Sequence, residues 1–292
     1  MLLSAHTATE IVKISNIIEG FSYILEMRRL YNQTQGQKGA FVVAVNSSWG
    51  IDYAWAEDHP IWCALYDSLG AVGILSVAAT TNNDKDIDRE GDMPCTCASK
   101  YLIGVSESSK EDRQVAGYGS QFVELFAPAE SKSTRWNNNY GDFGGTSGAA
   151  PHVTGAIALL YSYQNIGWSA MIQHSPRNAA LLVKSILLNS VDRKTAFSKS
   201  VSGGRLNLAR AMQQLVEHFT QPESGELLNI YPSPTQHFLT VKAALKTADE
   251  HPIRIYNYLG QIADVWTIQN NSPTISYWHF DVRHLDQGVY IL

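Results

Sequence analysis

Short, continuous apolar runs alternate with helical segments along the first part of the chain. Residues 41–45 and 73–79 form two such runs, and residues 101–105 and 122–126 are similar to them. A strand that is buried on both faces is apolar throughout, whereas a strand with one face in water alternates between apolar and polar residues. Strands of this kind, separated by helices, predict an α/β layer fold with a parallel sheet.

Helical periodicity and stop signals place the helices between these strands. Apolar residues recur at helical spacing over residues 8–31, after a capping-box pair formed by Thr7 and Glu10. A second helix is expected over residues 60–69, where Gly70 ends it. Further helices are expected from near Ser147 and over residues 179–189 and 206–218.

The pattern changes near residue 220. Residues 221–225 read Gln-Pro-Glu-Ser-Gly, which is typical of a polar linker. Beyond it come short β-type runs at residues 237–241, 253–256 and 274–278, with turn residues between them. We therefore expect an α/β domain over 1–219, a linker over 220–227 and a small all-β sandwich over 228–292.

Composition excludes several classes of protein. The 292 residues include 22 Lys and Arg and 27 Asp and Glu, so 17% are charged, against roughly 25% in an average soluble domain. A net charge of −5 without runs of basic residues argues against a nucleic-acid partner. The longest apolar runs, 40–45 and 156–161, are far shorter than the ~20 residues of a membrane span. Residues 1–6 lack the features of a secretory signal.

Residues 145–153, Gly-Thr-Ser-Gly-Ala-Ala-Pro-His-Val, form the most informative segment. A glycine-flanked turn delivers Ser147 to the start of a helix of small residues, and Pro151 is expected in the first helical turn. A hydroxyl at this position lies beside free backbone N–H groups and the positive end of the helix dipole, which suits a developing oxyanion. The alternative interpretation is a serine that only caps the helix.

This segment resembles the serine signature of the subtilisin-like serine proteases. Other stretches resemble the family in the same order along residues 1–218: Asn-Ser-Ser-Trp-Gly at 46–50, Val-Ala-Ala-Thr-Thr-Asn at 77–82, Ala-Pro at 127–128, Ser-Thr at 133–134, Tyr140 and Gly-Gly-Arg-Leu-Asn at 203–207. The resemblance implies a subtilisin-like fold and acyl-transfer chemistry that requires no cofactor.

The resemblance assigns roles to individual residues. Ser147 would be the nucleophile, and Asn82 would donate its amide to the oxyanion, with Asn83 as the neighbouring alternative. Ser48, Trp49 and Gly50 would pair with an extended protein or peptide substrate. The first specificity pocket would be lined by Ala79, Thr80 and Thr81. In this interpretation His152 is structural.

The family's catalytic Asp and His have no counterpart among these residues. None of the nine histidines lies in a His-Gly-Thr-His setting, and His6, which comes nearest by position, has no glycine-rich turn around it. We therefore expect both groups to lie upstream and this chain alone to be inactive. A serine without its base retains only the ~10³–10⁴ over water that the oxyanion hole and binding supply. The sheet would also lack its first strands, leaving residues 41–45 at an open edge.

Acidic and sulfur-containing residues offer weaker candidates. Four aspartates follow the oxyanion segment and could hold a structural calcium, although a solvated acidic loop is the favoured alternative: Asp84, Asp86, Asp88 and Asp92. Three cysteines allow one disulfide. Cys63 with Cys97 is the candidate pair, Cys95 is the alternative partner, and three reduced thiols is the third option.

Residues 229–235, 253–261 and 285–292 resemble segments of the C-terminal sorting domain of type IX secretion cargo from Bacteroidetes, a small Ig-like sandwich. This resemblance implies the type IX machinery as a partner and a secreted or cell-surface location. The family's last strand continues beyond residue 292, so we expect an incomplete module. An adhesion or carbohydrate-binding sandwich is the alternative.

Two functions follow from the sequence. The first is a serine endopeptidase whose Asp and His lie outside the chain. The second is a catalytically inactive, secreted peptide-binding or adhesion protein that reuses the same groove.

Overall fold

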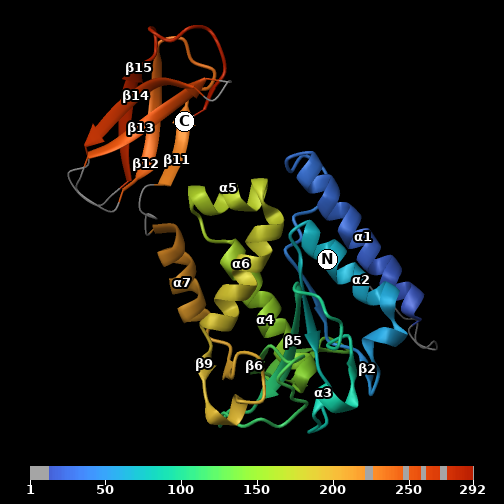
Figure 1. Ribbon diagram of the computed structural model, residues 1–292. Helices are drawn as coiled ribbons and strands as arrows, with labels where there is room; N and C mark the ends of the chain where they lie inside the picture. Colours follow the sequence, from blue (N-terminus) through green and yellow to red (C-terminus); the bar gives the residue numbers. More distant parts are fainter. Residues whose placement is uncertain (1–12, 221–225, 246–249, 258–260, 270–274, 292) are drawn as a thin grey trace. The chain divides into compact units, whose positions relative to one another are not determined.

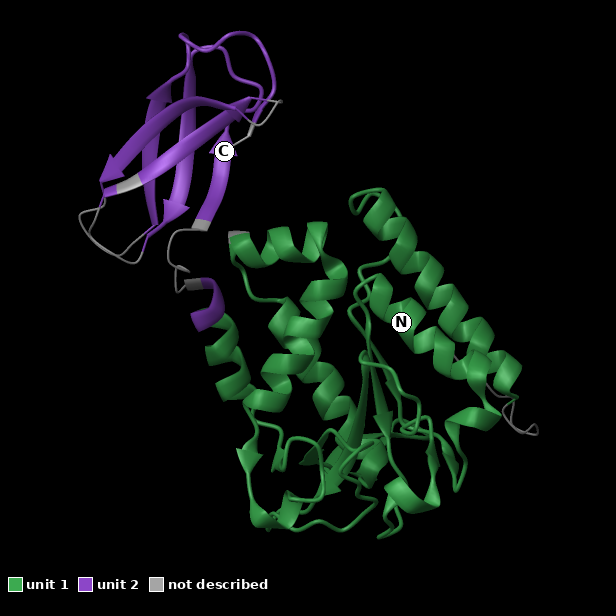
Figure 2. Ribbon diagram, in the orientation of Figure 1, with its two compact units in different colours: residues 1–216 green, residues 217–292 purple. Residues whose placement is uncertain are grey.

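The computed structural model describes residues 13–220, 226–245, 250–257, 261–269 and 275–291. The chain forms two compact units, residues 1–216 and 217–292 (Figures 1 and 2). In the described residues, no helix combines the length and the apolar character that a membrane crossing requires.

A six-stranded sheet organises the first unit. Its order is β1 (Ala44–Ser47), β3 (Leu75–Ala79), β5 (Leu102–Ser108), β6 (Leu125–Pro128), β10 (Gly204–Arg205) and β9 (Asp192–Arg193). All neighbouring pairs are parallel except β10 with β9. The predicted parallel sheet is confirmed, and β1 lies at its edge as expected.

Seven helices accompany the described strands. They are α1 (Ile14–Gln33), α2 (Pro60–Ala71), α3 (Ile87–Glu90), α4 (Thr146–Tyr161), α5 (Ile166–His174), α6 (Pro176–Asn189) and α7 (Leu208–Thr220). Two 3₁₀ turns, Ala56–Asp58 and Thr195–Phe197, complete the set. In Figure 1, α1 and α2 lie to the right of the sheet and α4 to its left. The predicted capping pair, Thr7 and Glu10, lies outside the described residues.

Strand β1 begins three residues later than the apolar run that predicted it, because the side chain of a buried arginine binds a backbone carbonyl within that run. Arg28 on α1 is 0% exposed and donates to the Val42 carbonyl at 2.6 Å. Its guanidinium also lies 4.4 Å from the centre of the Phe41 ring. Sheet pairing with β3 therefore starts at Ala44.

Two small antiparallel strand pairs outside the main sheet were not predicted. One is a hairpin that joins β7 (Ser131–Arg135) to β8 (Asn139–Phe143), and the other pairs β2 (Ile51–Asp52) with β4 (Asp92–Met93). The hairpin is largely exposed on both faces, and β2 and β4 have only two residues each. Neither pair therefore shows the apolar alternation by which a half-buried strand is recognised.

Helix α4 packs closely against the sheet because its first turns carry small residues. It contacts β1, β3, β5 and β6. Ala149, Ala150 and Ala156 are buried at this surface. A Cβ on Gly148 would lie 2.5 Å from the Ala129 carbonyl oxygen, so only glycine allows this approach.

The second unit contains two three-stranded antiparallel sheets. Their orders are β11 (Glu226–Tyr231), β12 (Phe238–Ala244), β15 (Ile275–Asp281) and β14 (Ile262–Gln269), β13 (Glu250–Asn257), β16 (Tyr290–Ile291). Trp266 on β14 stacks on Phe280 of β15 with 4.0 Å between ring centres. This contact joins the two sheets, which agrees with the predicted all-β sandwich.

Two helical glycines give a matched test of this packing. A Cβ on Gly70 of α2 would lie 1.9 Å from the ring of Tyr101, whereas a Cβ on Gly155 of α4 would meet nothing within 4 Å. We expect Gly70→Ala to lower the free energy of unfolding by about 3 kcal/mol through overpacking. Gly155→Ala should leave it unchanged or raise it by up to about 1 kcal/mol. Urea unfolding measures both, and equal effects would contradict this packing.

Candidate functional site

Ser147 is the second residue of α4, directly after a turn that only glycine suits. Gly145 has φ = 70°, and a Cβ there would also lie 2.5 Å from the Asn82 amide oxygen. The structure therefore places Ser147 at a helix N-terminus, where the first backbone N–H groups have no acceptor within the helix. Its side chain is half-buried.

Pro151 lies in the interior of α4, so its expected place in the first helical turn was wrong. A proline has no N–H, so the carbonyl four residues earlier, that of Ser147, loses its helical donor. The Ser48 hydroxyl takes this place and donates to the Ser147 carbonyl at 2.8 Å. The Ser147 hydroxyl in turn donates to the Ser48 carbonyl at 3.1 Å. Two reciprocal hydrogen bonds thus join the serine to the segment at residues 48–50.

Two further residues, neither of them assigned a role from the sequence, orient Ser48. Thr154 donates to the Asn46 amide oxygen at 3.0 Å, and the Asn46 amide nitrogen donates to the Ser48 hydroxyl at 2.9 Å. Spacing is a signal that was available: Asn46 and Ser48 are two residues apart at the end of a strand. Likewise Thr154 lies two helical turns beyond Ser147 on the same face of α4.

Asn82 is held by the residue next to the serine. Its amide oxygen accepts from the Thr146 backbone N–H at 2.9 Å and lies 3.1 Å from the Thr146 hydroxyl oxygen. This arrangement leaves the NH₂ group of the amide as a donor without a partner among the described residues. Asn83 is engaged elsewhere, since its amide nitrogen donates to the Asp52 carboxylate at 3.4 Å and the Thr81 hydroxyl at 3.2 Å.

The other segments that the sequence assigned to substrate binding lie next to these bonds. The Thr146 hydroxyl donates to the Thr80 carbonyl at 2.5 Å, which connects residues 79–82 to the start of α4. Ala79, Thr80 and Thr81 are buried. Trp49 is 40% exposed and stacks on Trp62 with 5.5 Å between ring centres. An exposed aromatic ring thus borders the segment that contains Ser48.

Among the described side chains, no histidine or carboxylate forms a hydrogen bond with the Ser147 hydroxyl. The His152 Nδ1 lies 2.8 Å from the Gly148 carbonyl oxygen of the same helix, so this ring forms a hydrogen bond within α4 and none with Ser147. His6 lies outside the described residues. The structure therefore brings together Ser147, Ser48 and Asn82, the residues to which the sequence assigned the nucleophile, substrate-binding and oxyanion roles, with no histidine or carboxylate bonded to the Ser147 hydroxyl among the described residues.

The four aspartates considered as calcium ligands have separate partners. Asp84 accepts from Gln114, Asp86 caps α3, Asp88 accepts from Ser120, and Asp92 accepts from Thr81. Over the described parts of the chain, no three His, Cys, Asp or Glu side chains are grouped as a metal site requires.

Asp92 has the most unusual environment of the four. It is 1% exposed, and its carboxylate accepts from the Thr81 backbone N–H at 3.0 Å. Burial raises the pKa of the Asp92 carboxyl to about 7, because loss of water penalises the charged form. The nearby Asp52 carboxylate adds to this rise in pKa, and the Thr80 hydroxyl and the Thr81 N–H oppose it.

The cysteines lie beside this carboxylate. Cys63 on α2 and Cys97 form a disulfide, and Cys95 is a buried free thiol. The Cys95 thiol donates to the Ala79 carbonyl at 3.7 Å, and burial raises its pKa. Cys95 and Asp92 therefore both form hydrogen bonds with the backbone of residues 79–81.

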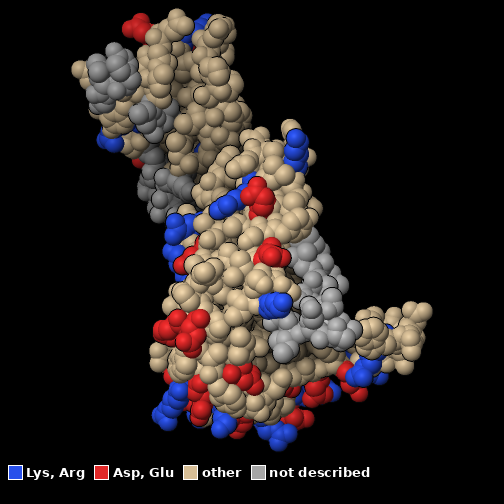
Figure 3. Space-filling model, turned by 90° about the vertical axis from the view of Figure 1, so that its right-hand side faces the viewer, with Lys and Arg blue, Asp and Glu red and all other residues tan. Residues whose placement is uncertain are grey.

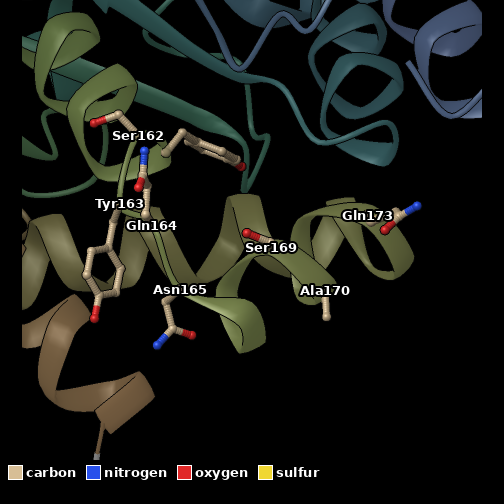
Figure 4. Close-up of a pocket in the computed structure, with 8 residues that line it drawn as sticks. Ser162, Tyr163, Gln164, Asn165, Ser169, Ala170 and Gln173 are labelled. Atoms are coloured by element: carbon tan, nitrogen blue, oxygen red, sulfur yellow. The ribbon is translucent and has the colours of Figure 1, made fainter. Parts of the chain in front are cut away.

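A separate open hollow of about 880 Å³ lies at the end of α4 and along α5. Figure 4 shows hydroxyl and amide side chains such as Ser169, Asn165 and Gln173 in its lining, and none of its lining residues is charged. Its lining includes neither Ser147 nor Asn82, so the hollow is distinct from the candidate site. Figure 3 shows both charge signs interspersed near the lower end of the first unit on the face that it displays.

Two protein families match the chain. The sequence model of the Subtilase family matches residues 10–211, and that of the secretion system C-terminal sorting domain matches residues 229–292. The major intracellular serine protease of Bacillus subtilis (strain 168) is 29% identical over 160 residues, which are 54% of this chain and 47% of that protein. Subtilisin-like protease 2 of Plasmodium falciparum is 35% identical over 121 residues, 40% of this chain and 9% of that protein. The chain thus spans less than half the length of these relatives.

Solved structures show the same fold at low sequence identity. The prenylagaramide maturation protease PagA has a TM-score of 0.53 at 17% identity, covering 72% of this chain and 70% of that one. The structure of the subtilase cytotoxin SubAB assembly has a TM-score of 0.53 at 20% identity, covering 71% of this chain and 67% of that one.

The raised pKa of Asp92 predicts a pH-dependent loss of stability. An aspartate ordinarily has a pKa of ~3.9, so between that pH and about 7 the folded protein retains a proton that the unfolded chain has released. Stability therefore falls as pH rises through this window and stays lower above it.

We expect Asp92→Asn to remove this loss, because the neutral amide can still accept from Thr81. At pH 8 the variant should be more stable than the wild type by on the order of 3 kcal/mol, and the difference should vanish near pH 4. Urea unfolding across this range measures it. The matched control is Asp286→Asn, an exposed aspartate in the other unit. If Asp92→Asn were less stable than the wild type at pH 8, the ionised Asp92 carboxylate would not be what lowers the free energy of unfolding.

Proposed function

The chain belongs to the subtilase family of serine proteases, and on this basis we propose that Ser147 is the nucleophile of a secreted endopeptidase. The observation that carries the proposal is the position of this hydroxyl. It stands at the N-terminus of α4, joined to Ser48 on one side and through Thr146 to Asn82 on the other. An isolated N-cap serine would not be connected to two separate strand ends in this way.

The geometry supports acyl transfer. The Ser147 oxygen would attack the scissile carbonyl, and the carbonyl oxygen would become an oxyanion beside the start of α4. The Ser147 backbone N–H and the Asn82 amide NH₂ are the donors proposed for that charge. The amide oxygen of Asn82 already accepts a hydrogen bond from the Thr146 backbone N–H, so the NH₂ end is oriented before substrate arrives.

Residues 48–50 are the proposed partner for an extended peptide, which would add as a further strand. Strand β1 lies at the edge of the sheet, directly before these residues. Ser48 is held by Asn46 and Ser147, which keeps this backbone in place. We propose Ala79, Thr80 and Thr81 as the wall of the first specificity pocket.

The proposed reaction also needs a histidine base to take the Ser147 proton and an aspartate carboxylate to orient that base. The described residues supply neither near Ser147, so we propose that an Asp-Thr/Ser-Gly and a His-Gly-Thr-His segment outside these 292 residues provide them. The residues of this chain then hold the nucleophile, the oxyanion donor and the substrate strand. A peptide-binding protein without catalysis is the second candidate, because the same segments suffice to bind an extended peptide.

The C-terminal unit marks the protein as secreted or located at the cell surface, because residues 229–292 match the secretion system sorting domain. We propose the type IX secretion machinery as the partner of this unit. A protein substrate outside the cell is consistent with this destination.

Covalent labelling by a fluorophosphonate tests the nucleophile. We expect the DNA upstream of Met1 to encode the two missing segments in frame, and a protein extended by them to be labelled on Ser147. Labelling of the 292-residue chain alone should be at least a thousandfold slower, since only the oxyanion hole and binding remain. Peptide mapping by mass spectrometry identifies the labelled residue.

Three variants of the extended protein complete this test. Ser147→Ala should abolish labelling, and Asn82→Ala should slow it by about 10²–10³, the effect of losing one oxyanion-hole donor in subtilisin itself. Ser162→Ala, an exposed serine just after α4, should label normally. An extended protein that binds peptides but is never labelled would favour the second candidate, and labelling that survives Ser147→Ala would refute the assignment.

A further inference from the structure

Asp92 is a buried carboxylate for which the described residues provide no cation. It is 1% exposed, and none of the ion pairs among the described residues involves Asp92 or Asp52. Burying a charge without a partner is costly, and proteins ordinarily avoid it by pairing the charge. The proposed chemistry at Ser147 makes no use of this group.

The carboxylate lies between the two segments that we assign to substrate binding. On one side, β4 pairs with β2, which follows Gly50 directly, and Asp92 is the partner of Asp52 in this register. A Cβ on Gly50 would lie 2.2 Å from the Met93 carbonyl oxygen, so the two segments touch. On the other side, the Thr81 N–H donates to the Asp92 carboxylate at 3.0 Å.

The polar groups around the carboxylate carry no positive charge. They are the Thr81 N–H, the Thr80 hydroxyl and the Cys95 thiol. The Thr80 hydroxyl is buried and makes no hydrogen bond of regular geometry. An ionised carboxylate can accept about four hydrogen bonds, so a ligand with several N–H donors and a positive charge would supply what these groups do not.

We propose that Asp92 makes this site selective for substrates with a lysine or arginine side chain on the N-terminal side of the scissile bond. The inference rests on the proposed function of Ser147 and names its substrate class. The side chain of that residue enters between residues 48–50 and 79–81, and its ammonium or guanidinium group pairs with the Asp92 carboxylate. The Asp52 carboxylate on the neighbouring strand adds negative charge to the same place.

The selectivity has a simple physical cause. A cation brought to Asp92 replaces the missing partner in a region from which water is excluded, where a charge-assisted hydrogen bond is strong. A neutral side chain of the same shape leaves the carboxylate unpaired, so the site rejects it. A carboxylate at the base of the first pocket acts in this way in another serine protease, trypsin.

Benzamidine and benzamide test the proposal on the 292-residue chain, because they have the same shape and only the first is a cation. The Thr81 amide resonance in ¹H–¹⁵N spectra reports binding, since this N–H is bonded to Asp92. We expect benzamidine to bind at least tenfold more tightly than benzamide at pH 8. Asp92→Asn should remove the preference, and Asp286→Asn should preserve it.

The pH dependence adds a readout that a purely structural role of Asp92 would not produce. The titratable groups that face the carboxylate are Asp52 from β2 and the Cys95 thiol, whose pKa burial raises. Benzamidine stays charged over pH 6–8, so its affinity should rise about tenfold in this interval as Asp92 ionises. The Asp92→Asn variant should show a flat profile.

Equal affinity for the two compounds, or a preference that persists in Asp92→Asn, would overturn the proposal. The binding assay does not depend on nucleophile chemistry, so the two proposals fail separately. If the wild-type chain binds benzamidine and benzamide equally while Ser147 is labelled, only the cation site is refuted. If Ser147 is not labelled while the wild-type chain prefers benzamidine, only the peptidase is refuted.

Discussion

One backbone carbonyl that has no donor within its own helix, that of Ser147, couples this helix to the strand beside it. Pro151 removes the N–H that would bind the Ser147 carbonyl within α4, and the Ser48 hydroxyl donates to it instead. The proline thus exchanges an ordinary helical bond for a bond between distant parts of the chain. Asn46 donates to the Ser48 hydroxyl, and Thr154 of α4 donates to Asn46. These hydrogen bonds hold α4 against the end of β1. Ser147 and the proposed substrate strand are therefore positioned by the same bonds.

Thr146 performs the corresponding task on the other side of Ser147. Its N–H donates to the Asn82 amide oxygen, and its hydroxyl donates to the Thr80 carbonyl. The chain continues from Thr80 to Thr81, whose N–H reaches Asp92. A continuous path of hydrogen bonds and peptide bonds thus connects Ser147 to a buried carboxylate. Burial raises the pKa of this carboxyl to about 7, because loss of water penalises its charged form.

The sequence predicted the elements with strong periodicity and missed those whose stability comes from elsewhere. The buried strands and the helix after Gly145 follow from apolar runs and small residues, and the structure contains them. The hairpin at residues 131–143 escaped prediction because its strands are polar on both faces. Arg28 lies within a predicted amphipathic helix, but its buried guanidinium shortens the first strand by binding the Val42 carbonyl. Pro151 was placed in the wrong turn because the group that compensates for its missing N–H lies 99 residues from Ser147 in the sequence.

The Gly-Thr-Ser-Gly-Ala-Ala-Pro segment predicted a serine at the start of a helix of small residues, and its resemblance to the serine signature of the subtilases indicated the family that the sequence comparison shows. Only the tertiary structure decided which other groups meet that serine. Asp92 looked like one of four neighbouring aspartates, yet the fold buries it between two segments and leaves the others with partners at the surface. The physical reason is that burial and pairing are properties of contacts between distant residues, while a local sequence pattern reports only backbone preference and the face of an element that is apolar.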